Sequence, residues 1–226
     1  MSLGFPISTM DGFYKDPMGI REYALTLPFF TDVAGLWPGK RTMCLSNFNP
    51  ELHDKISKRF FSIYFDFNFM NAEWNLYTGF QLIDEYSNDK DSVLNKSWIH
   101  RDADCLLAGI IYLNPEPYPD AGTTFYDLKS GYEPDDNLYI RRELHITGNV
   151  TSMDAYTKKM EEHSNMFTES AIVKNKFNRL VAYDANIYHG ASTHFNNGVP
   201  RLTQTFFVSR LISESHPPIH RINSYK

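Results

Sequence analysis

The amino-acid sequence predicts one mainly β domain with flanking helices, and three observations carry this prediction. Phe, Tyr and Trp make up 15% of the 226 residues, with 17 Phe and 14 Tyr, and such rings favour strands. Two helix-start signals occur early, and from about residue 71 short aromatic and β-branched runs replace the helical spacing. No repeat or flexible linker divides the chain, so 42% hydrophobic residues suffice for one domain over residues 1–226.

The flanking helices are expected within residues 16–62. Asp16 before Pro17 is typical of an N-cap with proline at the first helical position, and Asn49 before Pro50 repeats the pattern. Apolar residues then recur at helical spacing in both segments: Ile20, Tyr23, Ala24 and Leu27 in the first, and Leu52, Ile56 and Phe60 in the second. We interpret both segments as helices that pack on the domain.

A β core is expected over residues 71–128 and 171–211. The predicted strands cover residues 74–83, 105–113, 123–126, 180–183 and 202–209. Pro115 and Pro117 end the second of these strands, because proline cannot continue a strand ladder. Asn197 and Gly198, just before the last strand, predict a turn.

Residues 129–170 form a polar insert between the two parts of the core. Thr151 stands three residues before Asp154 and predicts a capping box. Apolar residues follow at helical spacing: Met153, Tyr156, Met160 and Phe167. The expected structure is an amphipathic helix packed on the domain, and a lid over a site is the alternative that the sequence leaves open.

Charge and cysteine content exclude several classes. The net charge of −5 disfavours nucleic-acid binding, and we interpret the pairs Arg141-Arg142 and Lys158-Lys159 as solvated surface charge. The two cysteines have neither disulfide-framework nor metal-like spacing, which favours a reducing compartment. No apolar run approaches the roughly 18 residues needed to span a bilayer, and no signal peptide is visible. We therefore expect a soluble protein of the cytoplasm.

The triplet His100-Arg101-Asp102 is the first candidate site. Side chains two apart in a strand project to the same side, so His100 and Asp102 can hold one ion while Arg101 points away. Two imidazoles and one carboxylate can bind one face of an iron(II) ion. The triplet alone is a weak signal, because a surface histidine beside an aspartate also produces it.

The residues that follow the triplet strengthen this hypothesis. His189 comes after an apolar strand, and Gly190 beside it permits close approach of backbone or ligand. Arg201 can offer a planar fork to a carboxylate, and Thr203 shares its face of the strand. Tyr112, on the strand after the triplet, adds a phenolic donor. Together these residues predict a metal site beside a site for a keto acid.

The spacing of these residues also sets a structural condition. If the Asn-Gly pair at 197–198 centred a two-residue hairpin, His194 would face Arg201, and His189 would point to the opposite side. A bulge, a longer loop or strands in different sheets must therefore intervene, and the last arrangement is natural in a double-sheet jelly roll. His194 remains the alternative second imidazole ligand.

These motifs resemble the iron(II)/2-oxoglutarate-dependent oxygenases, particularly the prolyl-hydroxylase-like branch. The segments that carry the resemblance are residues 100–102, 109–114, 121–125, 182–184, 188–191 and 200–203. The N-terminal portion, from residues 11–14 to residues 38–42, also looks like that of small oxygenases of marine bacteria and their phages. The resemblance covers most of the chain, with a gap at residues 129–170.

The resemblance implies a double-stranded β-helix, a cupin-like jelly roll. The implied Fe(II) ligands are His100, Asp102 and His189, and the implied contacts to the co-substrate 2-oxoglutarate are Arg201, Thr203 and Tyr112. The implied enzyme is a dioxygenase that uses O2 to hydroxylate a peptidyl residue such as proline, or a free small molecule, and releases succinate and CO2. Halogenating relatives lack the carboxylate that Asp102 supplies.

Two other hypotheses remain at this point. One is a non-catalytic metal-binding jelly-roll module, and the other is a nucleobase dealkylase, which the charge balance disfavours. The expected partner is a small-molecule or peptidyl substrate, with no nucleic acid and no membrane, and a homodimer is compatible with the sequence. If the chain is phage-encoded, the expected location is the host cytoplasm.

Overall fold

The computed structural model describes residues 5–66, 71–102, 104–134 and 139–213 of the chain. The early elements are β1 (Ser8–Asp11), α1 (Pro17–Thr26), β2 (Phe30–Thr31), β3 (Lys40–Arg41), the 3-10 turn η1 (Leu45–Asn47) and α2 (Pro50–Phe61). The middle elements are β4 (Ala72–Ile83), η2 (Val93–Asn95), β5 (Leu107–Tyr112), β6 (Thr123–Leu128), α3 (Tyr139–Thr147) and α4 (Met153–Ser164). The last four are β7 (Phe167–Val173), β8 (Arg179–Asp184), β9 (Tyr188–Ala191) and β10 (Arg201–Ser213).

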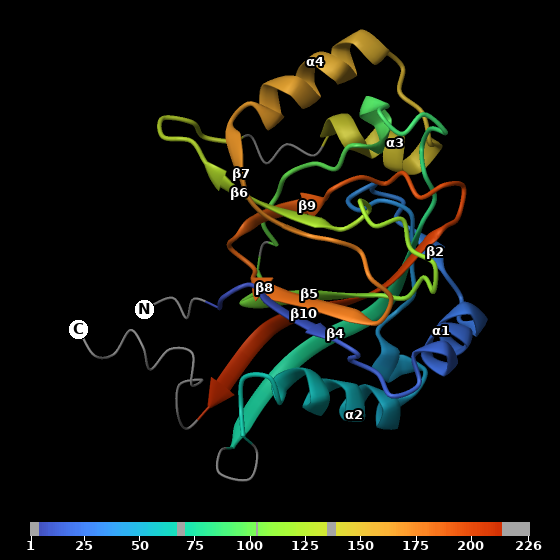
Figure 1. The fold of residues 1–226 in the computed structure, drawn as a ribbon, viewed down its shortest axis with the longest axis vertical. Helices are drawn as coiled ribbons and strands as arrows, with labels where there is room; N and C mark the ends of the chain where they lie inside the picture. Colours follow the sequence, from blue (N-terminus) through green and yellow to red (C-terminus); the bar gives the residue numbers. More distant parts are fainter. Residues whose placement is uncertain (1–4, 67–70, 103, 135–138, 214–226) are drawn as a thin grey trace.

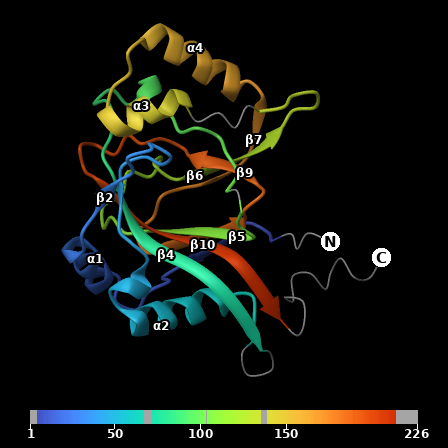
Figure 2. The same ribbon diagram turned by 180° about the vertical axis from the view of Figure 1, so that it is seen from behind.

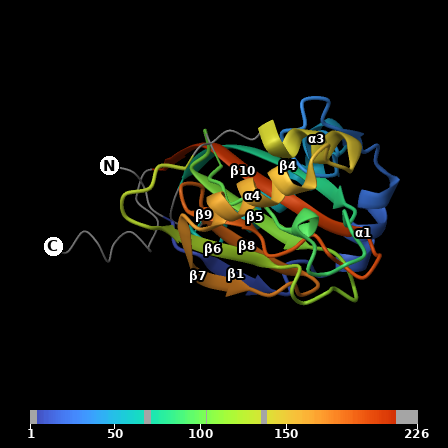
Figure 3. The ribbon, with the colours of Figure 1, turned by 90° about the horizontal axis from the view of Figure 1, so that it is seen from above.

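The strands form two antiparallel sheets in a jelly roll (Figure 1). The larger sheet has the order β1-β8-β5-β10-β4-β3-β2, and the smaller has the order β7-β6-β9. Helices α1 and α2 lie on the far side of the larger sheet, and α2 runs beneath β4 and β10 (Figure 2). Helices α3 and α4 lie on the side of the smaller sheet and overlie both sheets when the molecule is seen from above (Figure 3). The predicted fold class, mainly β with flanking helices in a jelly roll, is confirmed.

Both predicted N-terminal helices are present, with the predicted caps. The side chain of Asp16 accepts a hydrogen bond from the backbone N–H of Gly19 at 2.9 Å, and Asn49 caps α2 in the same way. Proline follows each cap because the first helical N–H needs no partner. Phe60 of α2 is fully buried and stacks on Phe206 of β10, with ring centroids 4.8 Å apart. This packing covers the outer face of the larger sheet.

Strand β10 separates the hydrophobic core from the site. Leu202, Phe206 and Val208 belong to the core cluster beneath the larger sheet. Arg201 and Thr205, on the other face of the same strand, line a cavity between the two sheets. The alternation of side chains along one strand therefore supplies both the core and the site.

The arrangement around residues 196–198 meets the condition set by the sequence. Asn197 and Gly198 turn the chain with φ of 55° and 73°. The turn does not form a hairpin, because β9 pairs with β6 in the smaller sheet whereas β10 pairs with β4 and β5 in the larger sheet. His189 and Arg201 consequently face the same interior from opposite sheets.

The polar insert differs in detail from the prediction. The N-cap of α4 is Ser152 and not Thr151, whose hydroxyl instead hydrogen-bonds to the carboxylate of Glu143. The helix ends at Ser164, so the helical spacing predicted to reach Phe167 is wrong at its end. Phe167 begins β7, which pairs with β6, and the β core resumes there rather than at residue 171.

Helix α3 and the strands β1, β2, β3, β7 and β9 were not predicted from the sequence. Strand β1 is short and polar, and it pairs with β8 at the edge of the larger sheet. Helix α3 lies inside the insert. The sequence just before it is rich in turn-forming residues, so the helical spacing of its own residues was not recognised. In the described ranges, no helix is both long enough and apolar enough to cross a membrane.

Candidate functional site

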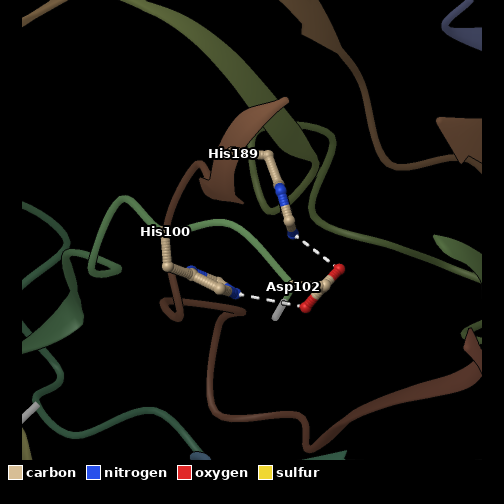
Figure 4. A group of neighbouring side chains, drawn as sticks. All are labelled: His100, Asp102 and His189. Carbon is tan, nitrogen blue, oxygen red and sulfur yellow. Dashed lines mark ion pairs between the residues drawn. The ribbon is translucent and has the colours of Figure 1, made fainter. Parts of the chain in front are cut away.

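Three of the predicted site residues meet between the two sheets (Figure 4). One ligand atom each from His100, Asp102 and His189 lies within 4.8 Å of the other two. The Nε2 atoms of His100 and His189 are 3.8 and 3.4 Å from the two carboxylate oxygens of Asp102. Within the described part of the chain, no other group of three such side chains has this arrangement.

Backbone hydrogen bonds, not a regular strand, bring the two segments together. His100 forms a single β-bridge with His189, with both N···O distances 2.9 Å, so the strand expected at residues 100–102 is wrong. The backbone N–H of Asp102 donates to the carbonyl of Ala185 at 3.0 Å. Arg101 is exposed and also lines the cavity, and its guanidinium lies 4.8 Å from the ring centroid of Tyr188.

Each imidazole is oriented by a second hydrogen bond. Nδ1 of His100 lies 2.9 Å from the carbonyl oxygen of Trp98, and Nδ1 of His189 lies 2.9 Å from that of Ile187. Since a carbonyl only accepts, Nδ1 of each ring donates the hydrogen bond, and Nε2 is the ring nitrogen that faces Asp102. Desolvation, and next the neighbouring His189, lowers the pKa of His100 to about 4, so His100 is neutral near pH 7.

Asp102 provides the observation that tests whether a metal fits. Its side chain is 13% exposed, and its Oδ2 atom is buried without a hydrogen-bond partner among the described residues. A buried carboxylate oxygen without a partner is costly, and a bound cation removes that cost. Two imidazoles fixed by backbone carbonyls, together with one carboxylate, form a donor set that fits an iron(II) ion.

Gly190 allows the two histidine segments to lie this close. A Cβ atom at this position would lie 3.1 Å from both the Ser97 hydroxyl oxygen and the Trp98 carbonyl oxygen. That carbonyl also orients His100, so it cannot move away freely. The predicted close approach at Gly190 is therefore an approach of backbone.

Arg201 is buried in the same cavity as the three candidate ligands. The cavity measures about 600 Å³, and Arg201 is only 3% exposed. Its Nε donates to the carbonyl of Ala121 at 3.1 Å, and its guanidinium lies 5.4 Å from the ring centroid of Tyr112. No carboxylate among the described residues forms an ion pair with it, and burial lowers its pKa. A bound carboxylate would supply the missing partner.

Thr203 and Tyr112 lie beside Arg201. Thr203 of β10 is paired in register with Tyr112 of β5. The Thr203 hydroxyl is buried and has no hydrogen-bond partner among the described residues, whereas the Tyr112 hydroxyl is 2.7 Å from that of Thr123. The fold thus brings the three predicted co-substrate residues together, and their role remains a prediction.

The cavity is also lined by residues to which the sequence analysis assigned no role in the site. These residues are Arg41, Arg141 and His145, and His194 lines the cavity with them. Arg141 is 3% exposed, so its interpretation as solvated surface charge is wrong, because α3 turns it inward. The signal that was overlooked is the spacing of Arg141 and His145, which places them on one face of a helix. His194 is not part of the metal-ligand group.

Solved structures share this fold at low sequence identity. EvdO2 from Micromonospora carbonacea var. aurantiaca is 13% identical with a TM-score of 0.53, over 96% of this chain and 90% of that one. Its complex with 2-oxoglutarate gives 14% identity and a TM-score of 0.52, with the same coverage. HygX from Streptomyces hygroscopicus, with nickel and 2-oxoglutarate bound, is 12% identical with a TM-score of 0.50, over 92% and 83%.

Comparison by sequence places the chain in a family. No curated protein matches it. The family described as "Family of unknown function (DUF6445)" matches residues 2–207, and the chain belongs to this family.

Proposed function

We propose that the chain is an iron(II)- and 2-oxoglutarate-dependent dioxygenase that hydroxylates a small molecule or a peptidyl residue such as proline. One observation carries the proposal: two imidazole Nε2 atoms converge with the unpartnered oxygen of Asp102 in a cavity that also buries Arg201. The fold shared with EvdO2 and HygX, whose structures hold 2-oxoglutarate, supports this choice of co-substrate.

In this proposal the protein holds the metal by one face. The Nε2 atoms of His100 and His189 and the carboxylate of Asp102 would hold the metal, which would supply a site for small ligands in the cavity. Iron(II) with 2-oxoglutarate and O2 supplies the oxidation that replaces a C–H bond by C–OH and releases succinate and CO2. The carbonyls of Trp98 and Ile187 hold both rings in place before the metal binds.

Arg201 would bind the distal carboxylate of 2-oxoglutarate. Its planar fork matches a carboxylate, and the low dielectric of the buried cavity strengthens each charge-assisted hydrogen bond. The unpartnered hydroxyl of Thr203 can donate one more hydrogen bond. Tyr112 packs beside the guanidinium and restricts its orientation.

Anaerobic titration with Fe(II) and 2-oxoglutarate tests this proposal. The wild-type protein should develop a visible charge-transfer band, and the His189→Ala variant should lose it because one ligand is missing. His194→Ala serves as the control, since His194 lies outside the ligand group, and this variant should keep the band. A folded wild-type protein that binds Fe(II) without developing the band would contradict the proposal.

Aerobic assays separate the proposed enzyme from the other two hypotheses. The enzyme should produce succinate from 2-oxoglutarate, whereas a non-catalytic metal-binding module would bind the metal and produce none. A dealkylase would repair alkylated oligonucleotides, and we expect no repair.

A further inference from the structure

The cavity is cationic although the whole chain is acidic. Among the described residues that line it, four are arginines and two are aspartates, which leaves an excess of two positive charges. The whole chain carries a net charge of −5. Iron(II) and the dianion 2-oxoglutarate cancel each other in charge, so the cationic excess would persist after both had bound.

Arg141 of α3 and His194 supply buried donors to the cavity and lie outside the metal-ligand group. Nη2 of Arg141 lies 3.4 Å from Nε2 of His194, and because arginine can only donate, Nδ1 of His194 carries the ring hydrogen. Neither Nε of Arg141 nor Nδ1 of His194 has a hydrogen-bond partner among the described residues. Arg141 is 3% exposed and His194 is 1% exposed, so water does not readily replace the missing acceptors.

Arg41 of β3 adds a third donor from another segment. Its guanidinium lies near two rings, 4.8 Å from the centroid of Trp37 and 5.5 Å from that of Phe207. A guanidinium that contacts a ring keeps N–H groups that can donate to an acceptor in its plane. The Nε atom of Arg41 is buried without a hydrogen-bond partner in the described structure.

A purely structural role does not account for these side chains. Among the described residues, no carboxylate forms an ion pair with Arg41 or Arg141. Buried charges and donors without acceptors destabilise a fold unless a ligand supplies the acceptors. All three side chains line the cavity that contains the metal site, and none comes from β10, which carries Arg201.

We propose that Arg41, Arg141 and His194 form a subsite that binds an anionic group of the substrate, either a carboxylate or a phosphate. The inference rests on the proposed function, because it names the class of substrate for the same cavity. It implies that the group to be hydroxylated belongs to a molecule with an acidic end, which the subsite holds while another part reaches the metal.

Two matched pairs of small molecules test this inference. Protein saturated anaerobically with Fe(II) and 2-oxoglutarate would be titrated calorimetrically with benzoate and benzamide, and with phenyl phosphate and phenol. At least one anion should bind at least tenfold more tightly than its neutral partner. Preference for benzoate indicates a carboxylate substrate, and preference for phenyl phosphate indicates a phosphate ester.

Variants assign the binding to this subsite. Arg41→Gln and Arg141→Gln should each weaken binding of the preferred anion at least tenfold. Arg210→Gln, at an exposed position on β10, should leave it within twofold of wild type. Arg141→Lys retains the charge without the planar fork, and it should bind the anion with intermediate affinity; it replaces Arg141→Gln if that variant fails to fold.

Two outcomes would overturn the inference. One is that neither anion binds better than its neutral partner, and the other is that neither the Arg41 nor the Arg141 variants change the affinity. The charge-transfer band separates this failure from failure of the proposed function, because the band depends on the metal and 2-oxoglutarate alone. If the band does not form, the same titrations of the metal-free protein decide whether the subsite exists.

Discussion

The two sides of the cavity satisfy their polar atoms in different ways. On the metal side, the chain itself binds Nδ1 of His100 and of His189 through backbone carbonyls. On the side formed by α3 and the β9–β10 loop, Nε of Arg141, Nε2 of His145 and Nδ1 of His194 are buried without partners among the described residues. The fold therefore orients both imidazoles of the metal side and leaves one atom, Oδ2 of Asp102, for a cation, whereas the other side has three buried nitrogen atoms for a different ligand.

This difference has an energetic consequence. A buried polar group without a partner costs about 1–3 kcal/mol, so the α3 side lowers the stability of the ligand-free protein. On the metal side the cost of an unsatisfied buried atom arises mainly at Oδ2 of Asp102, and a bound cation removes it. Substitutions on the two sides should therefore affect different properties.

Removal of Asp102 should have the largest effect. Asp102→Ala deletes the only carboxylate of the ligand group, so the affinity for Fe(II) should fall more than about 100-fold. Asp104→Ala is the matched control, because Asp104 lines the same cavity and lies outside the ligand group. Anaerobic calorimetry with Fe(II) measures both variants, and equal losses in the two would remove the special role of Asp102.

Substitution of Arg201 should have an intermediate effect. Arg201→Gln removes the charge-assisted hydrogen bonds to the distal carboxylate, so the affinity for 2-oxoglutarate should fall about 10- to 100-fold. The affinity for Fe(II) should not change, because Arg201 is not in the ligand group. Titration of the charge-transfer band with 2-oxoglutarate measures the effect, and an unchanged affinity would exclude the proposed contact.

The fold and the metal side could be predicted because local signals determine them. Asp16 and Asn49 each cap the helix that begins at the next residue, and these interactions span a few positions. The spacing of His100 and Asp102 was informative even though the strand was absent, since the bridge to His189 holds the backbone in an extended form. The separation of His189 from Arg201 followed from the two-residue period of a strand.

The α3 side could not be predicted, because its residues meet only through tertiary packing. Arg141 lies in a charged segment that looks like surface, and its burial depends on how α3 packs over the cavity. Arg41 belongs to a strand of two residues, which is too short to show a pattern. The sequence allowed His194 as a metal ligand. In the structure it lines the cavity beside Arg141 instead.

The smallest predicted effect concerns acid stability on the α3 side. Burial, and next Arg141, lowers the pKa of His145 from its ordinary value of 6.5 to about 3. Between these values the unfolded chain binds a proton that the folded chain does not, so stability falls as the pH drops from 6.5 towards 3. The slope for one such histidine is about 1.4 kcal/mol per pH unit, and stability is fully retained above pH 6.5.

Replacing His145 isolates this contribution from that of the metal side. His145→Phe cannot bind the proton, so its free energy of unfolding should fall less between pH 7.5 and 5.5 than that of the wild type. Urea denaturation of the metal-free proteins at both pH values measures the difference. If the free energy of unfolding falls equally in the wild type and the variant, His145 does not titrate as its burial requires. The affinity for Fe(II) at pH 7.5 should be the same in both proteins, because His145 lies outside the ligand group. A change in that affinity would mean that the two sides of the cavity are coupled and that the contrast between them is incomplete.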